Sequence, residues 1–148
     1  MSGPVDREVR SEVADVLVRY ATGIDRRDWD LFRSCFTDDC DIEYPGIGVW
    51  HSAEEITGWM RDVHEPCGHT LHRISNVAVT EGTRGVTARS YVDAIVMFAG
   101  NRTGTRAAGS YDDELVPTGD GWKLARRRFT VVLLEWIPEG TNLDLGPG

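Results

Sequence analysis

The sequence has few cysteines, no long hydrophobic run and a deficit of basic residues. Its three cysteines, Cys35, Cys40 and Cys67, include no Cys-x-x-Cys pair, which is typical of reduced thiols rather than of a disulfide framework. No apolar run approaches the ~20 residues that a membrane-spanning helix needs. We therefore expect a soluble protein that needs no disulfides.

The deficit of basic residues excludes two classes of partner. Sixteen lysines and arginines against 24 acids give a net charge of −8, which repels nucleic-acid phosphates and anionic lipid surfaces. The one basic cluster, Arg126 to Arg128, lies in a strand-like run whose alternation sends neighbouring side chains to opposite faces. Residues 1–8 contain acids and no apolar segment typical of a secretory signal, so we expect a cytoplasmic location.

The remaining composition is that of a single globular domain. With 41% hydrophobic and 27% charged residues over 148 positions, the chain is long enough to bury a core. Apolar residues at three- and four-residue steps predict three helices in the first half. These run from Val5 to Ile24, from an Asp28 N-cap through Trp29, Phe32 and Phe36, and from a Ser52–Glu55 capping box to near Pro66. Residues 140–148, with their Gly and Pro, indicate a loose tail.

Strands are predicted around and after the third helix. A short strand, Cys40 to Tyr44, ends at a glycine-spaced turn, and four long segments after Gly68 are rich in β-branched and aromatic residues. These segments cover residues 70–80, 85–98, 105–117 and 122–137. Because tight glycine turns join them, they predict an antiparallel meander with the helices on one face. The expected fold class is α+β.

Three of the four histidines and one cysteine fall within nine positions, which raises the question of a metal site. His64, Cys67, His69 and His72 are all residue types that zinc accepts. However, Pro66 and Gly68 place the first part of this segment in a loop, and no second paired set accompanies it. We therefore expect no metal, and we expect His64 and His69 to be exposed loop residues.

His72 differs from its neighbours because it lies two residues into a predicted strand and shares a face with Ile74. A buried imidazole needs a partner, and it becomes a proton acceptor when a carboxylate holds its other ring nitrogen. Asp25, where the first apolar pattern runs directly into charge, is the best candidate for that carboxylate. From the residues alone, an aspartate facing solvent at the end of a helix is an equal alternative.

Several segments resemble the SnoaL-like branch of the nuclear transport factor 2-like superfamily, over residues 5 to about 135. The similarity lies in residues 21–29, 36–40, 70–76, 109–115 and 121–123. The resemblance implies a conical α+β barrel, in which three N-terminal helices pack on a curved mixed or antiparallel sheet and enclose a pocket. It is strongest to the branch that contains scytalone dehydratase and hexachlorocyclohexane dehydrochlorinase, whose catalytic aspartate and histidine fall on Asp25 and His72.

The resemblance also implies roles for other side chains. Tyr44 would polarise a substrate carbonyl, although packing is the commoner role of a tyrosine on an edge strand. Arg127 would assist the leaving group, with a register uncertain by one because arginines flank it. Apart from the resemblance, Trp50, Trp59 and Met60 are candidates to line the mouth of the pocket, although packing in the core is an equal alternative for the apolar face of the third helix. Asp93 is expected on the outer face of the sheet, in a salt bridge with Arg89, rather than in the pocket.

These observations favour a cofactor-independent lyase of the dehydratase type, acting on a small hydrophobic, cyclic or polyketide-like molecule. An isomerase or cyclase using the same pair of residues is one alternative, because the same proton abstraction can end in reprotonation or ring closure. A ligand-binding or assembly module without catalysis is the other. A homo-oligomer, dimer or trimer, is expected because Val131 to Leu134 carry apolar side chains on both faces of a strand.

Overall fold

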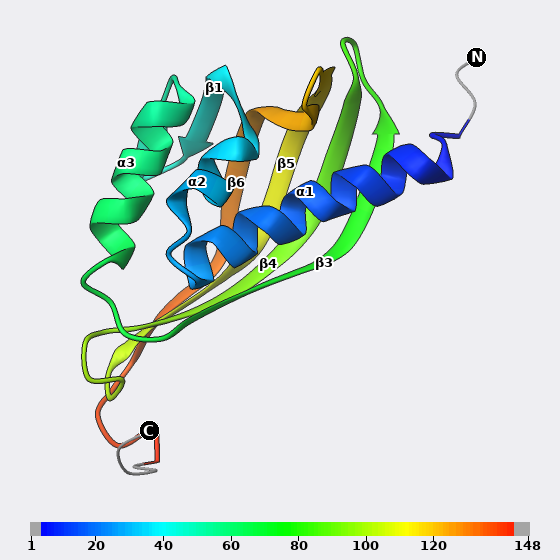
Figure 1. Ribbon diagram of the computed structural model, residues 1–148. Helices are drawn as coiled ribbons and strands as arrows, with labels where there is room; N and C mark the ends of the chain where they lie inside the picture. The colour runs from blue at the N-terminus through cyan, green and yellow to red at the C-terminus, as the bar shows by residue number, and fades with distance from the viewer. Residues whose placement is uncertain (1–3, 144–148) are drawn as a thin grey trace.

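The computed structural model describes residues 4–143, and it forms three helices on one face of a six-stranded sheet (Figure 1). The helices are α1 (Arg7–Asp25), α2 (Trp29–Ser34) and α3 (Ala53–His64). The strands are β1 (Phe36–Tyr44), β2 (Gly48–Trp50), β3 (Thr70–Glu81), β4 (Val86–Met97), β5 (Gly104–Thr118) and β6 (Gly121–Ile137). The α+β class predicted from the sequence is confirmed.

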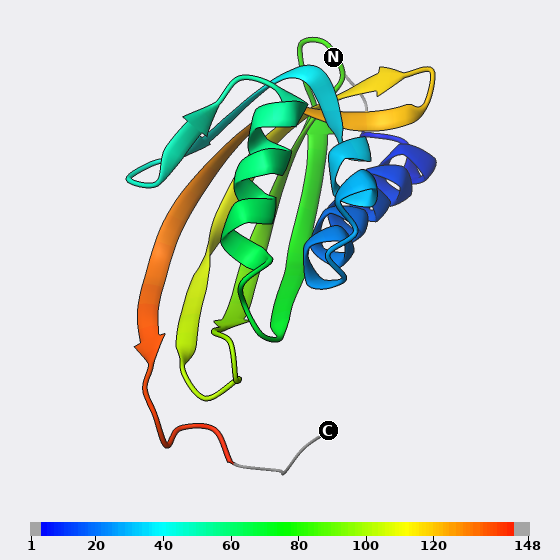
Figure 2. The same cartoon turned by 60° about the vertical axis from the view of Figure 1, so that its left-hand side comes forward.

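The sheet has the order β2-β1-β6-β5-β4-β3, so the predicted meander from β3 to β6 forms its larger part. These four strands pair antiparallel, whereas β1 pairs parallel with β6 and makes the sheet mixed. The sheet curves around the helices without closing, because β2 and β3 remain its edges (Figure 2). The cone-shaped α+β fold is confirmed in this open form.

One local prediction was wrong, and one short strand was not predicted. Phe36 begins β1 instead of ending the second helix, because that helix stops at Ser34 and the Cys35 carbonyl accepts a hydrogen bond from Leu124 N–H of β6 at 2.8 Å. The predicted turn is present at residues 45–47, and the short strand β2 that follows it, which was not predicted, pairs with β1 from Tyr44–Gly48 to Ile42–Trp50. The error at Phe36 arises because pairing with β6, which is distant in sequence, overrides the local pattern.

Capping residues fix where the helices begin. The Asp6 carboxylate accepts the Glu8 N–H at 2.8 Å, the Asp28 carboxylate accepts the Leu31 N–H at 3.0 Å, and the Ser52 hydroxyl accepts the Glu55 N–H at 3.1 Å.

Between α1 and α2 the chain turns sharply. A Cβ at Gly23 would lie 2.8 Å from the Phe32 backbone nitrogen, so the two helices approach closely only over a glycine. Arg27 then adopts a left-handed backbone with φ +55°, which ends α1 with Asp25 held at its last turn.

The C-terminal half of β6 projects beyond the helices (Figure 2). β1 pairs with β6 only as far as Arg128, so from Phe129 onward one edge of β6 has no partner among the described residues. Val131 to Leu134 were expected to place one face in the pocket, but they lie outside it and are all exposed, as is Trp136.

The described residues contain no helix long and apolar enough to cross a membrane. Of the predicted loose tail, residues 140–143 are exposed and residues 144–148 lie outside the described residues, as do residues 1–3 of the segment judged not to be a secretory signal.

Candidate active site

His72 and Asp25 lie together where the end of α1 meets the start of β3. The His72 Nδ1 and Asp25 Oδ1 atoms are 2.7 Å apart, and the two side chains are 7% and 22% exposed. Because a carboxylate can only accept, Nδ1 carries the proton and Nε2 is left as an unprotonated acceptor. This arrangement fits a general base oriented by a carboxylate.

The Asp25 carboxylate is held by several further donors. The His72 backbone N–H donates to Oδ2 at 2.8 Å, and the Thr70 hydroxyl donates to Oδ1 at 2.9 Å. Burial acts to raise the pKa of Asp25, but the hydrogen bonds from His72 and Thr70 hold the pKa below its ordinary value. Arg27 supports the arrangement, since its guanidinium donates to the Thr70 hydroxyl at 2.8 Å and to the Gly68 carbonyl at 2.7 Å.

His72 faces a cavity of about 120 Å³ between the sheet and α3. This is somewhat smaller than an engineered cavity of ~150 Å³ that binds benzene. Its wall is largely apolar and aromatic, with polar atoms from three tyrosines and two histidines. The lining residues are Tyr20, Tyr44, Ile47, Trp59, Met60, His64, His72, Val92, Ala94, Val96, Ala107, Tyr111 and Phe129. Asp25 is not among them and lies behind His72.

Three tyrosine hydroxyls meet at the wall of this cavity. Tyr20 Oη lies 2.8 Å from Tyr44 Oη and 3.2 Å from Tyr111 Oη. These two hydrogen bonds use two of the three hydroxyl protons, so one proton remains for another acceptor. Burial raises the pKa of all three phenols well above their ordinary value, which keeps them neutral donors.

Arg127, which was predicted to assist the leaving group, lies behind the tyrosines and does not line the cavity. Its side chain is 0% exposed, and its Nε and Nη2 donate to the two Asp113 carboxylate oxygens at 2.7 and 2.9 Å. Its guanidinium carbon lies 4.4 Å from the Tyr20 ring centroid and 3.7 Å from that of Tyr111. Arg126 and Arg128 point to the opposite face, as the alternation predicted.

His64 is not the exposed loop residue that the sequence predicted. It ends α3, is 5% exposed, and its ring centroid lies 5.7 Å from that of His72. Its Nδ1 lies 2.9 Å from the Met60 carbonyl oxygen, so Nδ1 carries the proton. Burial lowers the pKa of His64 to about 4.

Nothing in the described part of the chain gathers three or more side chains of the types that hold metals. His64 and His72 supply two imidazoles, while the nearby Cys67 is turned to the Val63 carbonyl. A tetrahedral protein site for zinc needs more ligands than these two histidines.

Of the other predicted site residues, Met60 and Tyr44 line the cavity, whereas Trp50 does not. The Trp50 ring packs against Trp59 with centroids 4.6 Å apart, and Trp59 takes the expected place on the wall. Asp93 lies on the outer face as predicted, but it pairs with Arg73 and Arg106 instead of Arg89.

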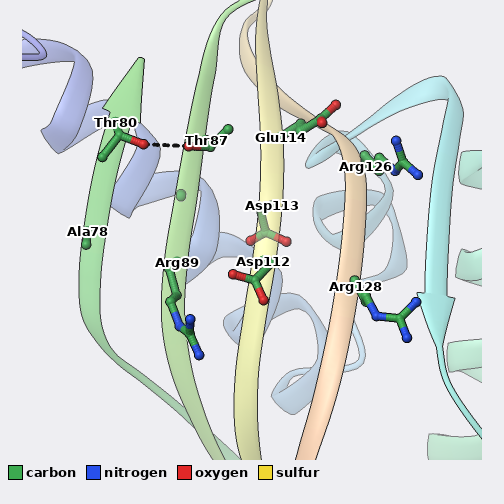
Figure 3. Close-up of a pocket in the computed structure, with 10 residues that line it drawn as sticks. Ala78, Thr80, Thr87, Arg89, Asp112, Asp113, Glu114, Arg126 and Arg128 are labelled. Carbon is green, nitrogen blue, oxygen red and sulfur yellow. Dashed lines mark hydrogen bonds between the residues drawn. The ribbon is translucent and has the colours of Figure 1, made fainter. Parts of the chain in front are cut away.

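Two larger hollows lie on the outer face of the sheet, away from His72. One, of about 450 Å³, is lined by charged side chains of β4, β5 and β6 (Figure 3). Arg89, Asp112 and Arg128 are neighbours across these strands, so opposite charges alternate along this hollow. The other, of about 630 Å³, contains the Asp93 ion pairs. Both have the character of a solvated sheet surface.

Comparison with known proteins shows the family of this chain. The chain matches the family model of the SnoaL-like domain over residues 6–128. A protein of Mycobacterium tuberculosis and one of Mycobacterium bovis are each 34% identical over 122 residues, or 80% of this chain and 82% of theirs.

Solved structures share the fold over nearly the whole chain. A protein of Novosphingobium aromaticivorans described as an aromatic ring hydroxylase superposes with TM-score 0.80 at 27% identity, covering 91% of this chain and 96% of its own. A scytalone dehydratase-like protein of the same organism gives 0.77 at 17% identity over 90% and 94%. A hexachlorocyclohexane dehydrochlorinase gives 0.81 at 19% identity over 93% and 95%.

Proposed function

Because the chain belongs to the SnoaL-like family, we propose that it is a cofactor-independent lyase in which His72, oriented by Asp25, removes a proton from carbon. The observation that carries this proposal is the 2.7 Å contact between His72 Nδ1 and Asp25 Oδ1 beside an apolar cavity. It leaves Nε2 of His72 as a base on the cavity wall. A protein that only binds ligands has no need of such a carboxylate–imidazole pair.

The reaction we propose is an elimination, most simply of water. A C–H bond next to a carbonyl breaks, its proton moves to His72 Nε2, and the electron pair moves toward the carbonyl oxygen. The electron pair then returns from the oxygen to form a C=C bond as the C–O bond on the neighbouring carbon breaks, and the departing hydroxyl takes the proton from the imidazolium and leaves as water. Asp25 stabilises the imidazolium that forms between these two steps.

The tyrosines suit the electrophilic side of this reaction. Their one unshared proton can be donated to the carbonyl oxygen, where negative charge develops. The buried guanidinium of Arg127 behind Tyr20 and Tyr111 adds a positive field on the same side. We therefore propose that Tyr44 polarises the carbonyl as part of a three-tyrosine cluster, and that Arg127 acts only indirectly, through Tyr20 and Tyr111.

The size of the cavity points to a small, mostly apolar substrate, on the order of one ring. The dehydratase and the dehydrochlorinase among the similar structures both have names that denote eliminations, which motivates this reaction class. The same base also serves an isomerase or a cyclase. Identification of the product separates these three outcomes, because only elimination releases the leaving group.

A screen of hydroxylated ring ketones, beginning with 3-hydroxycyclohexanone, tests the proposal. We expect a hit that yields the unsaturated ketone and water with the wild type and with His69→Gln, a control at an exposed histidine. His72→Gln should retain binding and lose turnover, since proton transfer matters only in the transition state. Equal turnover by His72→Gln on the hit would refute the proposed base.

We also propose a cytoplasmic, self-associating protein. The cysteines Cys35, Cys40 and Cys67 are free, which suits a reducing compartment. The unpaired edge of β6 beyond Phe129, together with exposed Leu134 and Trp136, offers a surface that a second copy would cover.

A further inference from the structure

His64 is a polar residue of the cavity wall that the proposed reaction does not use. Its ring centroid lies 6.5 Å from that of Trp29 and 5.7 Å from that of His72, so these two rings flank it. With its Nδ1 proton donated to the Met60 carbonyl, its Nε2 is an acceptor that has no hydrogen-bond partner among the described residues. The residue is 5% exposed and lines the cavity, so a ligand there that supplies a donor to Nε2 gains a hydrogen bond.

We propose that His64 is a specificity-determining residue that accepts a hydrogen bond from a retained hydroxyl group of the substrate. This inference rests on the proposed function only in taking the same cavity as the substrate site. The hydroxyl is not the leaving group, because a leaving hydroxyl needs to receive a proton and His64 Nε2 has none to give. The substrate class thus narrows to ring compounds that carry a hydroxyl besides the group eliminated.

The chemistry of the wall supports a hydrogen-bond donor such as a hydroxyl over acceptor groups and anions. A carbonyl or phosphate oxygen would meet the lone pair of Nε2 and be repelled. Because the pKa of His64 is lowered to about 4 by burial, the ring stays neutral near pH 7 and offers no charge to an anion. The tyrosine cluster supplies the donor for a carbonyl, so the wall has separate places for an acceptor and a donor on the ligand.

Binding of phenol and toluene, two rings of similar size, tests this inference without turnover. Calorimetry measures the affinity of each ligand for the wild type and for His64→Leu. The substitution should lower the affinity for phenol about three- to tenfold more than the affinity for toluene, as expected for one hydrogen bond between neutral groups. His69→Leu, the same change at an exposed site, should leave both affinities unchanged. Equal losses for the two ligands, or no binding of phenol at any soluble concentration, would overturn the inference.

Nitrogen-15 NMR of the wild type provides a second readout that does not depend on the variant folding. We expect His64 to show a protonated Nδ1 and an unprotonated Nε2, and the Nε2 resonance to shift with phenol but not with toluene. A protonated Nε2, or no response to phenol, would contradict the assignment. If the proposed elimination is wrong, the His64 Nε2 resonance should still shift with phenol. If the His64 inference is wrong, His72 should still be essential for proton removal, but the His64 resonance should not respond to phenol.

Discussion

Replacing Arg127 with methionine should destabilise the fold far more than an ordinary surface substitution. The guanidinium is 0% exposed and bound to Asp113 through two hydrogen bonds of 2.7 and 2.9 Å. Burial disfavours its charge, but the adjacent carboxylate raises the pKa of Arg127 above its usual value, so the pair is ionised. Arg127→Met would leave the Asp113 charge buried without a partner, at a cost of about 3–5 kcal/mol.

The double variant Arg127→Met/Asp113→Leu distinguishes the loss of one charge of the ion pair from the loss of both. Two apolar side chains of similar volume remove both charges, so we expect stability within about 1–2 kcal/mol of the wild type. Urea denaturation followed by circular dichroism measures the four free energies of unfolding. A double variant that loses the sum of the two single losses would show that the two charges are not coupled.

Three further predictions concern groups in and around the site. Asp25→Asn should lower kcat at least about tenfold, because an amide holds the His72 ring but cannot stabilise the imidazolium; unchanged kcat would count against the pair. The pKa of His64 is about 4 in the folded protein and ~6.5 in the unfolded chain, so between those pH values only the unfolded chain binds the proton. The free energy of unfolding should therefore fall as the pH is lowered through this range, by about 3 kcal/mol in all. Urea denaturation of His64→Phe at several pH values should show this pH dependence reduced by that amount. Trp136→Glu, at a 75% exposed position near the unpaired edge of β6, should shift the protein toward monomer in light scattering, and a wild type already monomeric at micromolar concentration would contradict self-association.

The long elements were predictable because their patterns are strong and locally consistent. The four strands from β3 to β6 agree with prediction to within one or two residues at each end, since glycine turns mark both ends. β2 was missed because a three-residue strand has no periodicity of its own and exists only by pairing with β1. The parallel pairing of β1 with β6 joins segments about 85 residues apart, which no local pattern encodes.

At the site, the residues alone indicated His72 more clearly than Asp25. His72 shares a strand face with Ile74, whereas Asp25, where an apolar helix pattern meets charge, was equally compatible with a solvent-facing aspartate, and the family resemblance favoured the pair. His64 was misjudged because Pro66 suggested a loop, whereas α3 runs through His64 and turns its ring inward.

Tyr20 and Tyr111 were missed as a group because their hydroxyls meet Tyr44 only after α1, β1 and β5 converge. The helical spacing of Tyr20 with Val13, Val16 and Leu17 predicted burial but not a polar partner. Buried tyrosines on separate elements are a usable signal, since each hydroxyl needs a partner.

Hydrogen–deuterium exchange at the carbon next to a carbonyl tests the central claim most directly, because it reports proton removal without knowledge of the leaving group. Cyclohexanone in heavy water, followed by proton NMR, suits the roughly one-ring cavity. Wild-type protein and His69→Gln should accelerate the exchange equally, and His72→Gln should lose at least about a hundredfold of that acceleration. Exchange by His72→Gln at the wild-type rate would contradict the account.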